Sequence, residues 1–355
     1  MPKRLLVINP GSTSTKLAVF EDYQQVLDTT LRHSAEELAE FTSTYSQKDF
    51  RKRIIAETLE KENYALKSFH AIIGRGGMVR PLKSGTYKVN AKLLEDLTQA
   101  KYGEHASNLG GILSDELAKE AGCDAYISDP IVVDEMHDIA RISGLPEMPR
   151  RAVFHALNQK ATARKYCAEV GKSYKDVNIL VCHMGGGISV GVHKEGKIID
   201  VNNCVNGAGT FSPERAGTLP ADDLIKLCFS GKYTQQEINK MINGKGGLMA
   251  HLGMNQAHHI VDRINAGDHK AALVLDAMAY NIAKEIGAAA TVLSGQVEAI
   301  LLTGGIAHND YVCERVIKNI AFIAPVKRYP GEDEMNALVS NTMQVLEGKE
   351  PCLEY

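Results

Sequence analysis

Three glycine-bearing turns, each following a run of apolar residues, place the strongest constraint on how this chain can fold. They lie at residues 9–16, 183–187 and 303–306. Glycine lets backbone N–H groups approach an anion closely, and neighbouring hydroxyls add further donors. None of the turns has the spacing GxxxxGK[ST], and none is a GxGxxG that opens a helix, so a P-loop or Rossmann site is poorly supported. Three such turns spread over both halves of the chain predict a polyphosphate ligand.

The first two turns each belong to a strand–turn–strand element of the same design. The apolar run 5–8 meets the first turn and a strand pattern resumes at 17–20, while the run 179–182 meets the second turn and returns over 188–192. This repetition predicts two related domains, although any α/β protein contains several such hairpins. A chain of 355 residues is about right for two domains.

Helical periodicity alternates with these strands. Apolar residues at i, i+3 and i+4 predict helices over 92–100, 108–121, 154–170, 219–229, 235–242 and 270–293, and a buried strand is expected over 297–302. The chain is therefore expected to be α/β. Residues 139–151, with Pro146 and Pro149, are the best candidate for a domain boundary, and a ligand would sit in a cleft between the domains.

Composition excludes several classes of protein. Apolar residues make up 44%, charged residues 23%, and the formal net charge is −3, which is typical of a globular protein and unfavourable for nucleic-acid binding. The seven cysteines are scattered and form no CxxC pair, which argues against a disulfide framework or structural zinc and fits a reducing cytosol. No apolar run approaches the roughly 20 residues of a membrane span, so we expect a cytoplasmic protein without a membrane partner.

Three motifs resemble those of a known family. Residues 7–16, VINPGSTSTK, resemble the first phosphate signature of the acetate and butyrate kinases, the short-chain carboxylate kinases. Residues 182–187, CHMGGG, resemble the second phosphate element of that family, and 302–307, LTGGIA, resemble its adenosine element. The likeness runs in order along essentially the whole chain. The length and the forms INPGSTSTK and CHMGGG favour the butyrate-type members.

The resemblance implies a fold shared with sugar kinases, actin and heat-shock ATPases. Two actin-like (ribonuclease H-like) domains, each a mixed sheet flanked by helices, would enclose a nucleotide cleft. One domain would comprise residues 1–150 plus 331–355, with a returning C-terminal helix near 335–346. The other, nucleotide-binding domain would comprise residues 151–330. A homo-oligomer, a dimer or larger, is also expected from the family.

The resemblance assigns roles residue by residue. The expected catalytic residues are Arg75, Asp129, His155, His183 and Arg215. Arg75 and Phe154 would meet the carboxylate substrate, and Glu334 with Asp129 would bind the metal. The expected phosphate and nucleotide ligands are Asn9, Ser12, Ser14, Lys16, Gly185, Gly186, Gly187, Gly304, Gly305 and Ile306. Two alternatives stay open, namely Arg80 in place of Arg75, and Glu332 or Asp333 in place of Glu334.

The implied reaction is butyrate + ATP giving butyryl phosphate + ADP, with Mg²⁺ as cofactor. Two arginines and a lysine can neutralise the charge that develops when one anion attacks another, because guanidinium forks match carboxylate and phosphate oxygens. A carboxylate is already ionised at pH 7, so no general base is required, and the acidic residues would hold magnesium through water. The alternatives are a kinase for isobutyrate, other branched acids, propionate or acetate, and, more remotely, a nucleotide-gated binding or assembly ATPase.

Overall fold

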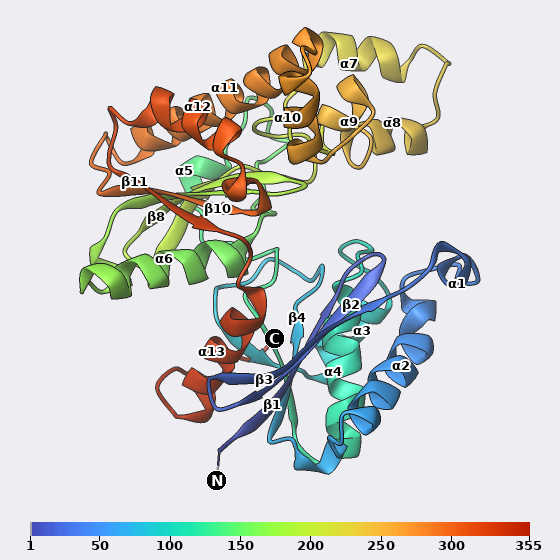
Figure 1. Ribbon diagram of the computed structural model, residues 1–355. Coiled ribbons are helices and arrows are strands. Elements are labelled where there is room, and N and C mark those ends of the chain that lie inside the picture. Colours follow the sequence, from blue (N-terminus) through green and yellow to red (C-terminus); the bar gives the residue numbers. More distant parts are fainter. Residues whose placement is uncertain (1) are drawn as a thin grey trace. The chain divides into compact units, whose positions relative to one another are not determined.

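The computed structural model describes residues 2–355, which form two compact units (Figure 1). Unit 1 contains the chain up to Val133 together with Asp333–Tyr355, and unit 2 is Asp134–Glu332. Residues 134–150, which we had placed in the first domain, therefore belong with unit 2. The backbone N–H of His137 donates to the carbonyl of Ile199 at 2.9 Å, and Arg150 pairs with Asp200 at 2.7 Å.

Unit 1 is built on a six-stranded mixed sheet with the strand order β3-β2-β1-β4-β6-β5. Its strands are β1 (Arg4–Pro10), β2 (Ser14–Glu21), β3 (Gln24–Arg32), β4 (Ala71–Arg75), β5 (Thr86–Lys88) and β6 (Asp124–Ser128). Its helices are α1 (Ala35–Ala39), α2 (Lys48–Lys61), α3 (Ala91–Thr98), α4 (Asn108–Ala121) and α13 (Glu334–Leu346). Helices α4 and α13 both pack on β1, β4 and β6, from opposite sides of the sheet (Figure 1).

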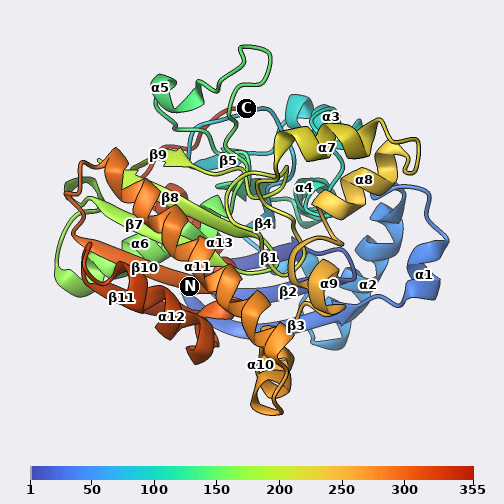
Figure 2. The ribbon, with the colours of Figure 1, turned by 90° about the horizontal axis from the view of Figure 1, so that it is seen from above.

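Unit 2 is built on a five-stranded mixed sheet with the order β11-β10-β7-β8-β9. Its strands are β7 (Ile179–Met184), β8 (Ile188–Lys194), β9 (Lys197–Val201), β10 (Ala299–Gly304) and β11 (Val326–Pro330). Its helices are α5 (Asp138–Arg141), α6 (Ala156–Val170), α7 (Ala221–Cys228), α8 (Gln235–Ile242), α9 (Gly247–Leu252), α10 (Ala257–Asn265), α11 (His269–Val292) and α12 (Asp310–Ile320). Figure 2 shows the long helix α11 crossing the strands of this sheet.

The two sheets share one strand plan. In unit 1, β1 pairs antiparallel with β2 and parallel with β4, and β4 pairs parallel with β6. In unit 2, β7 pairs antiparallel with β8 and parallel with β10, and β10 pairs parallel with β11. The predicted repetition of a strand–turn–strand element is therefore part of a larger repeat. The predicted class, α/β with two helix-flanked mixed sheets, is confirmed.

Alternating residues of the unit 2 strands face two different cores, because successive side chains of a strand point to opposite faces. Leu180 and Cys182 of β7 pack with α11, whereas Ile179 and Val181 pack with α6. Strands buried on both faces explain why 179–182 and 299–302 read as continuous apolar runs in the sequence.

The predicted helices are confirmed, with ends that shift by no more than a few residues. Helix α2 was not predicted. Its buried residues are Arg51, Ile55 and Leu59, so a charged side chain occupies one position of the inward-facing stripe and disguises the apolar periodicity. Within residues 2–355, none of the helices combines the length and apolar character that crossing a bilayer requires.

Candidate active site

The turn between β1 and β2 is anchored by a buried arginine of α2. Arg51 is 1% exposed. Its guanidinium donates to the carbonyl oxygens of Gly11 (2.9 Å), Ser14 (3.0 Å) and Ser12 (3.1 Å), and to the hydroxyl of Thr15 (3.0 Å). A trans peptide directs its C=O and its N–H oppositely, so the N–H groups that follow Gly11 and Ser12 point away from the guanidinium. Burial lowers the pKa of Arg51 to about 10, which leaves it charged at neutral pH.

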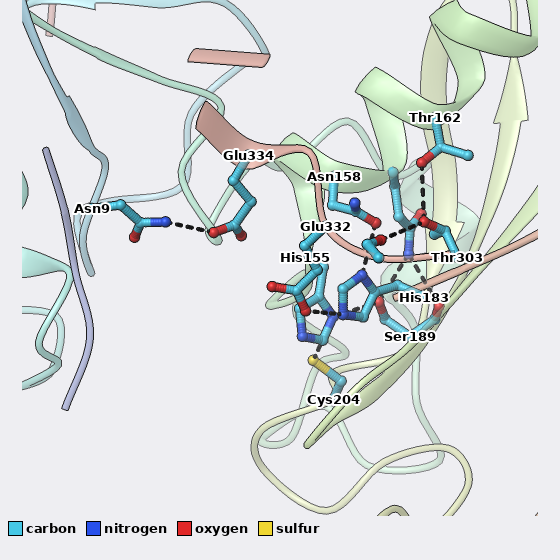
Figure 3. A network of polar contacts seen from close by, with 12 residues as sticks. Asn9, His155, Asn158, Thr162, His183, Ser189, Cys204, Thr303, Glu332 and Glu334 are labelled. Carbon is cyan, nitrogen blue, oxygen red and sulfur yellow. Dashed lines mark hydrogen bonds and ion pairs between the residues drawn. The ribbon is translucent and has the colours of Figure 1, made fainter. Parts of the chain in front are cut away.

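Asn9, near the end of β1, forms a cluster with Arg75 and Glu334. The Asn9 amide donates to Glu334 Oε2 at 2.7 Å, and Arg75 pairs with Glu334 Oε1 at 2.8 Å. Asn9 and Glu334 are each 5% exposed, so this carboxylate is a buried charge compensated by the guanidinium. Figure 3 shows Glu334 reaching toward Asn9 from the start of α13.

Lys16 lies on the same face of the sheet as this cluster. It is directly opposite Asn9 in the antiparallel register, and side chains opposite one another share a face. Lys16 and Ser12 are exposed and Ser14 is half-buried. The structure thus brings together Asn9, Lys16, Arg75 and Glu334, with the serines in the adjoining turn.

Asp129, directly after β6, is held by a different set of contacts. Its Oδ1 accepts from the hydroxyl of Ser84 (2.6 Å) and the N–H of Gly85 (2.9 Å), and its Oδ2 accepts from Asn341 (3.0 Å). Its φ of +40° is one that non-glycine residues rarely adopt, so these contacts fix a strained backbone. Among residues 2–355 no group of three or more His, Cys, Asp or Glu side chains is placed to hold a metal ion.

The two candidate substrate arginines have different surroundings. Arg75 pairs with the buried Glu334, whereas the Arg80 guanidinium lies 4.4 Å from the ring centre of Tyr355. The backbone N–H of Arg80 also donates to the Tyr355 hydroxyl at 3.1 Å. Arg80 therefore contacts Tyr355, whereas Arg75 contacts two of the predicted site residues, Asn9 and Glu334.

The three consecutive acidic residues also separate. Glu332 lies 3.2 Å from His183 in unit 2, and Asp333 accepts from Asn336 at 2.6 Å. Glu334 is the one that contacts Arg75. The sequence left open which of these three residues matches the metal-associated glutamate. In the structure each of the three has a different partner.

His155 and His183 form a stacked pair in unit 2. Their ring centres are 3.7 Å apart at an interplanar angle of 12°, with His155 preceding α6 and His183 on β7. The fully buried His183 places Nδ1 at 2.8 Å from Asn158 Oδ1 and Nε2 at 3.2 Å from the Glu332 carboxylate (Figure 3). A Cβ on Gly185 would lie 3.0 Å from His183 Nε2, so glycine keeps this nitrogen clear of a side chain.

Arg215 packs directly against Gly187 in the second turn. A Cβ on Gly187 would lie 1.7 Å from Arg215 Nη1, so the guanidinium occupies the space that a side chain would need. The same Nη1 donates to the carbonyl of Cys204 at 2.7 Å and lies 3.4 Å from its sulfur. That sulfur is 3.8 Å from His155 Nδ1. Burial raises the pKa of the Cys204 thiol, although Arg215 opposes the shift.

Ser212 fixes the loop that carries Arg215 to the same turn. Its hydroxyl donates to the Gly186 carbonyl at 2.5 Å and accepts from the Arg215 N–H at 3.2 Å. The predicted residues His155, His183, Arg215 and 185–187 therefore lie together in unit 2. Phe154, only 2% exposed, immediately precedes His155.

The third turn begins at the same sheet edge as the second. Strands β7 and β10 are parallel and Thr303 is opposite His183. Gly304 has a φ of +86°, and a Cβ there would lie 2.5 Å from the Met184 carbonyl oxygen, so only glycine fits. A pocket of about 500 Å³ opens beside this turn, and its lining includes Ile306, His258, Val261, Asp262 and Tyr311.

Sequence reasoning missed the residues that hold the predicted ones in place, chiefly Arg51, Asn158, Gln159, Ser189 and Cys204. No motif singles them out, because each acts through a contact between elements distant in the sequence. Gln159 offered a weak signal, since it is a polar residue on the inward face of a predicted helix.

The chain is similar to known proteins over its whole length. Residues 147–339 match the acetokinase family. The chain is 54% identical over 355 residues to butyrate kinase 2 of Clostridium acetobutylicum, covering 100% of both chains. It is 52% identical over 352 residues to butyrate kinase 1 of the same organism, covering 99% of each.

A solved structure extends the comparison to the fold. The structure of Porphyromonas gingivalis acetate kinase superposes with a TM-score of 0.80 at 21% identity, over 97% of this chain and 100% of that one. The predicted fold and the predicted family are both confirmed. The identity over the full length with these relatives, together with the match over more than half of the chain, shows that this chain belongs to the acetokinase family.

Proposed function

We propose that this chain phosphorylates the carboxylate of butyrate with ATP, giving butyryl phosphate and ADP in a reversible reaction. The observation that carries the proposal is the identity of about half of all residues, over the whole length, with proteins named butyrate kinase. We further propose that Asn9, Lys16, Arg75 and Glu334 of unit 1 contribute to this reaction, and that His155, His183 and Arg215 of unit 2 contribute to it as well.

The charges of the two clusters suit this chemistry. A carboxylate attacking the γ-phosphate is already ionised, so the reaction needs positive charge and hydrogen-bond donors rather than a base. Lys16 and Arg75 in unit 1, and Arg215 in unit 2, supply the cations. The backbone N–H groups of the 9–16 and 183–187 turns supply further donors to phosphate oxygens. Phe154 as a border of the acyl group stays a prediction.

Magnesium fits the first cluster through Glu334. Two of the roughly four lone-pair sites of its carboxylate are used by Asn9 and Arg75, which leaves acceptor capacity toward metal-bound water. When bound, the metal would neutralise charge on the β- and γ-phosphates. Asp129 accepts from Ser84, Gly85 and Asn341, so its proposed metal role depends on the acceptor capacity that remains.

The adenosine moiety is proposed to occupy the pocket beside the third turn. Ile306 and Val261 offer apolar surface for a base, and His258 and Asp262 offer polar groups at its edge. A cytoplasmic location, where ATP and the acid are both available, and a homo-oligomeric state are part of the same proposal.

The test is acyl phosphate formation across acids of two to five carbons, including isobutyrate, with hydroxylamine as the trap. We expect the highest kcat/KM with butyrate, and a 10- to 200-fold decrease for each methylene added or removed, which corresponds to about 1–3 kcal/mol. Faster turnover with acetate would reassign the substrate. ADP release that is indifferent to added acid would favour an assembly ATPase instead.

A further inference from the structure

A chain of buried polar side chains leads to His155 from the outer side of unit 2. The Tyr174 hydroxyl lies 2.7 Å from His193 Nδ1, and His193 Nε2 lies 3.1 Å from Gln159 Oε1. Gln159 Nε2 lies 2.9 Å from Ser189 Oγ, which in turn lies 2.9 Å from His155 Nδ1. His193, Gln159 and Ser189 are fully buried, so water cannot replace any of these partners.

The amide nitrogen of Gln159 fixes which groups donate and which accept in this series of hydrogen bonds. Gln159 Nε2 also lies 3.1 Å from the backbone carbonyl oxygen of Ser189. A carbonyl oxygen can only accept, so the Gln159 atom that faces it must be the amide nitrogen. The two N–H bonds of that nitrogen are then directed to the carbonyl and to the hydroxyl of Ser189. Gln159 Oε1 necessarily faces His193.

The contacts of His193 with Gln159 and Tyr174 are consistent with this assignment of donors and acceptors. Because Gln159 Oε1 accepts, His193 carries a proton on Nε2 and its Nδ1 accepts from the Tyr174 hydroxyl. This requires a neutral ring with one proton. Burial holds the pKa of His193 well below its usual value, which keeps the ring neutral.

The contacts of Ser189 and Cys204 with His155 determine which ring nitrogen of His155 carries the proton. Ser189 Oγ accepts from Gln159, so its own proton is available to His155 Nδ1 (Figure 3). The sulfur of Cys204, a protonated thiol in this buried position, also faces Nδ1 at 3.8 Å. Two potential donors converge on one nitrogen, which therefore acts as an acceptor. A His155 ring with a single proton therefore carries that proton on Nε2.

We propose that Gln159 and Ser189 are positioning residues that hold His155 in the Nε2–H tautomer, so that it donates a hydrogen bond to the transferring phosphoryl group. This inference rests on the proposed function for its catalytic consequence. The opposite tautomer would present a lone pair to an anion and would repel it. A hydrogen-bond donor placed where charge develops is worth about 10²–10³ in kcat.

The first test reads the tautomer directly in the wild-type protein. Long-range ¹H–¹⁵N correlation spectra distinguish a protonated from an unprotonated ring nitrogen, and the His155→Asn variant identifies which signals belong to His155. We expect a neutral ring protonated on Nε2. A ring protonated on Nδ1 would overturn the proposal, whether or not any variant folds.

The second test reverses the donor and acceptor roles in this series of hydrogen bonds. In Gln159→Glu, a carboxylate of the same shape cannot donate to Ser189, so the serine hydroxyl turns toward it and Oγ becomes an acceptor for His155. We expect the Nδ1–H tautomer, a decrease in kcat of about 100-fold, and a KM for ATP within a few-fold of wild type. Ser189→Ala should give mixed tautomers and an intermediate kcat. An unchanged tautomer and kcat in both variants would contradict the proposal.

Tyr174→Phe is the matched control. It removes a hydrogen bond from the outer end of the same chain but leaves the Ser189 carbonyl in place, so the tautomer and kcat should stay near wild type. A loss as large as that of Gln159→Glu would mean that any loosening of this region impairs turnover, and would count against the proposal. If the wild-type protein forms no butyryl phosphate, the proposed function fails while the tautomer is still measured.

Discussion

At the scale of single residues, the approach of Arg215 to Gly187 links a backbone position to a side-chain position. A Cβ added to Gly187 would lie 1.7 Å from Arg215 Nη1, so the guanidinium occupies that space. The Nη1 group is held there by its hydrogen bond to the Cys204 carbonyl oxygen, at 2.7 Å. Gly187 needs no left-handed backbone, so what it supplies is space. Any side chain at this position has to displace the cation.

We therefore expect Gly187→Ala to reduce acyl phosphate formation nearly as much as Arg215→Ala does. The clash falls on the end of a flexible side chain, so the protein should fold and the guanidinium should move away from Cys204. A loss of about 10²–10³ in kcat is expected from a misplaced charge at a phosphoryl-transfer site. Steady-state kinetics and thermal melts measure the two effects separately.

Gly144→Ala is a suitable control, because a Cβ there meets no atom within 4 Å. It should retain wild-type kinetics. If Gly187→Ala were equally active, Arg215 could not be acting from the position that the structure gives it.

At the scale of elements, helix α2 is important because it supports the turn between β1 and β2. Arg51 contacts three carbonyl oxygens of that turn and the Thr15 hydroxyl, and Ile55 and Leu59 of the same helix are also buried. The helix therefore positions the Arg51 guanidinium, which holds the backbone of the turn by hydrogen bonds.

Arg51→Met should raise the KM for ATP by about tenfold or more and destabilise the protein by roughly 2–4 kcal/mol, because three partly buried carbonyl groups lose their donor. Arg51→Lys should recover part of both losses, since an ammonium can donate to some of these oxygens but lacks the fork. Urea unfolding and ATP titrations provide the measurements.

Arg53→Met tests whether charge alone matters, since Arg53 is an exposed residue of the same helix. It should leave both quantities near wild type. Equal effects of Arg51→Met and Arg53→Met would rule out a specific role for the buried contacts.

The elements also show what could be read from the sequence and what could not. Helices with regular periodicity, such as α4 and α8, were predicted with their bounds, and strands with continuous apolar runs were predicted to within three residues at each end. The three turns were found because glycine needs no tertiary context to be recognised. Arg51, Gln159 and Ser189 were missed because their roles depend on pairing between elements that are far apart in the sequence. The limits of the units also differ from prediction, since 134–150 is bound by contacts to β9 and the residues around it.

At the scale of the whole molecule, each unit contains a buried histidine that is kept neutral. Burial lowers the pKa of His33 in unit 1 and that of His193 in unit 2 below the usual 6.5, and Arg51 adds to the effect on His33. An unfolded chain binds protons at these histidines below pH 6.5 while the folded chain does not. Folding stability must therefore decrease as the pH falls below that value.

The free energy of unfolding should decrease by up to about 1.4 kcal/mol per pH unit for each of these histidines, until the pH reaches the lowered pKa of the folded state. His33→Gln and His193→Gln should each reduce this slope, whatever they do to stability at neutral pH. Urea unfolding between pH 5 and pH 7.5 measures it. Identical slopes in the wild type and both variants would show that folding does not lower the pKa of either ring.

The third glycine-bearing turn, at residues 303–306, limits which substitutions the sequence can accept. Gly304 combines a φ of +86° with a carbonyl oxygen 2.5 Å from any Cβ, whereas a Cβ on its neighbour Gly305 would meet no atom within 4 Å. Of these two adjacent glycines, the first therefore has no room for a side chain and the second has room for one. A library that diversifies nucleotide preference should begin at Gly305 and leave Gly304 untouched.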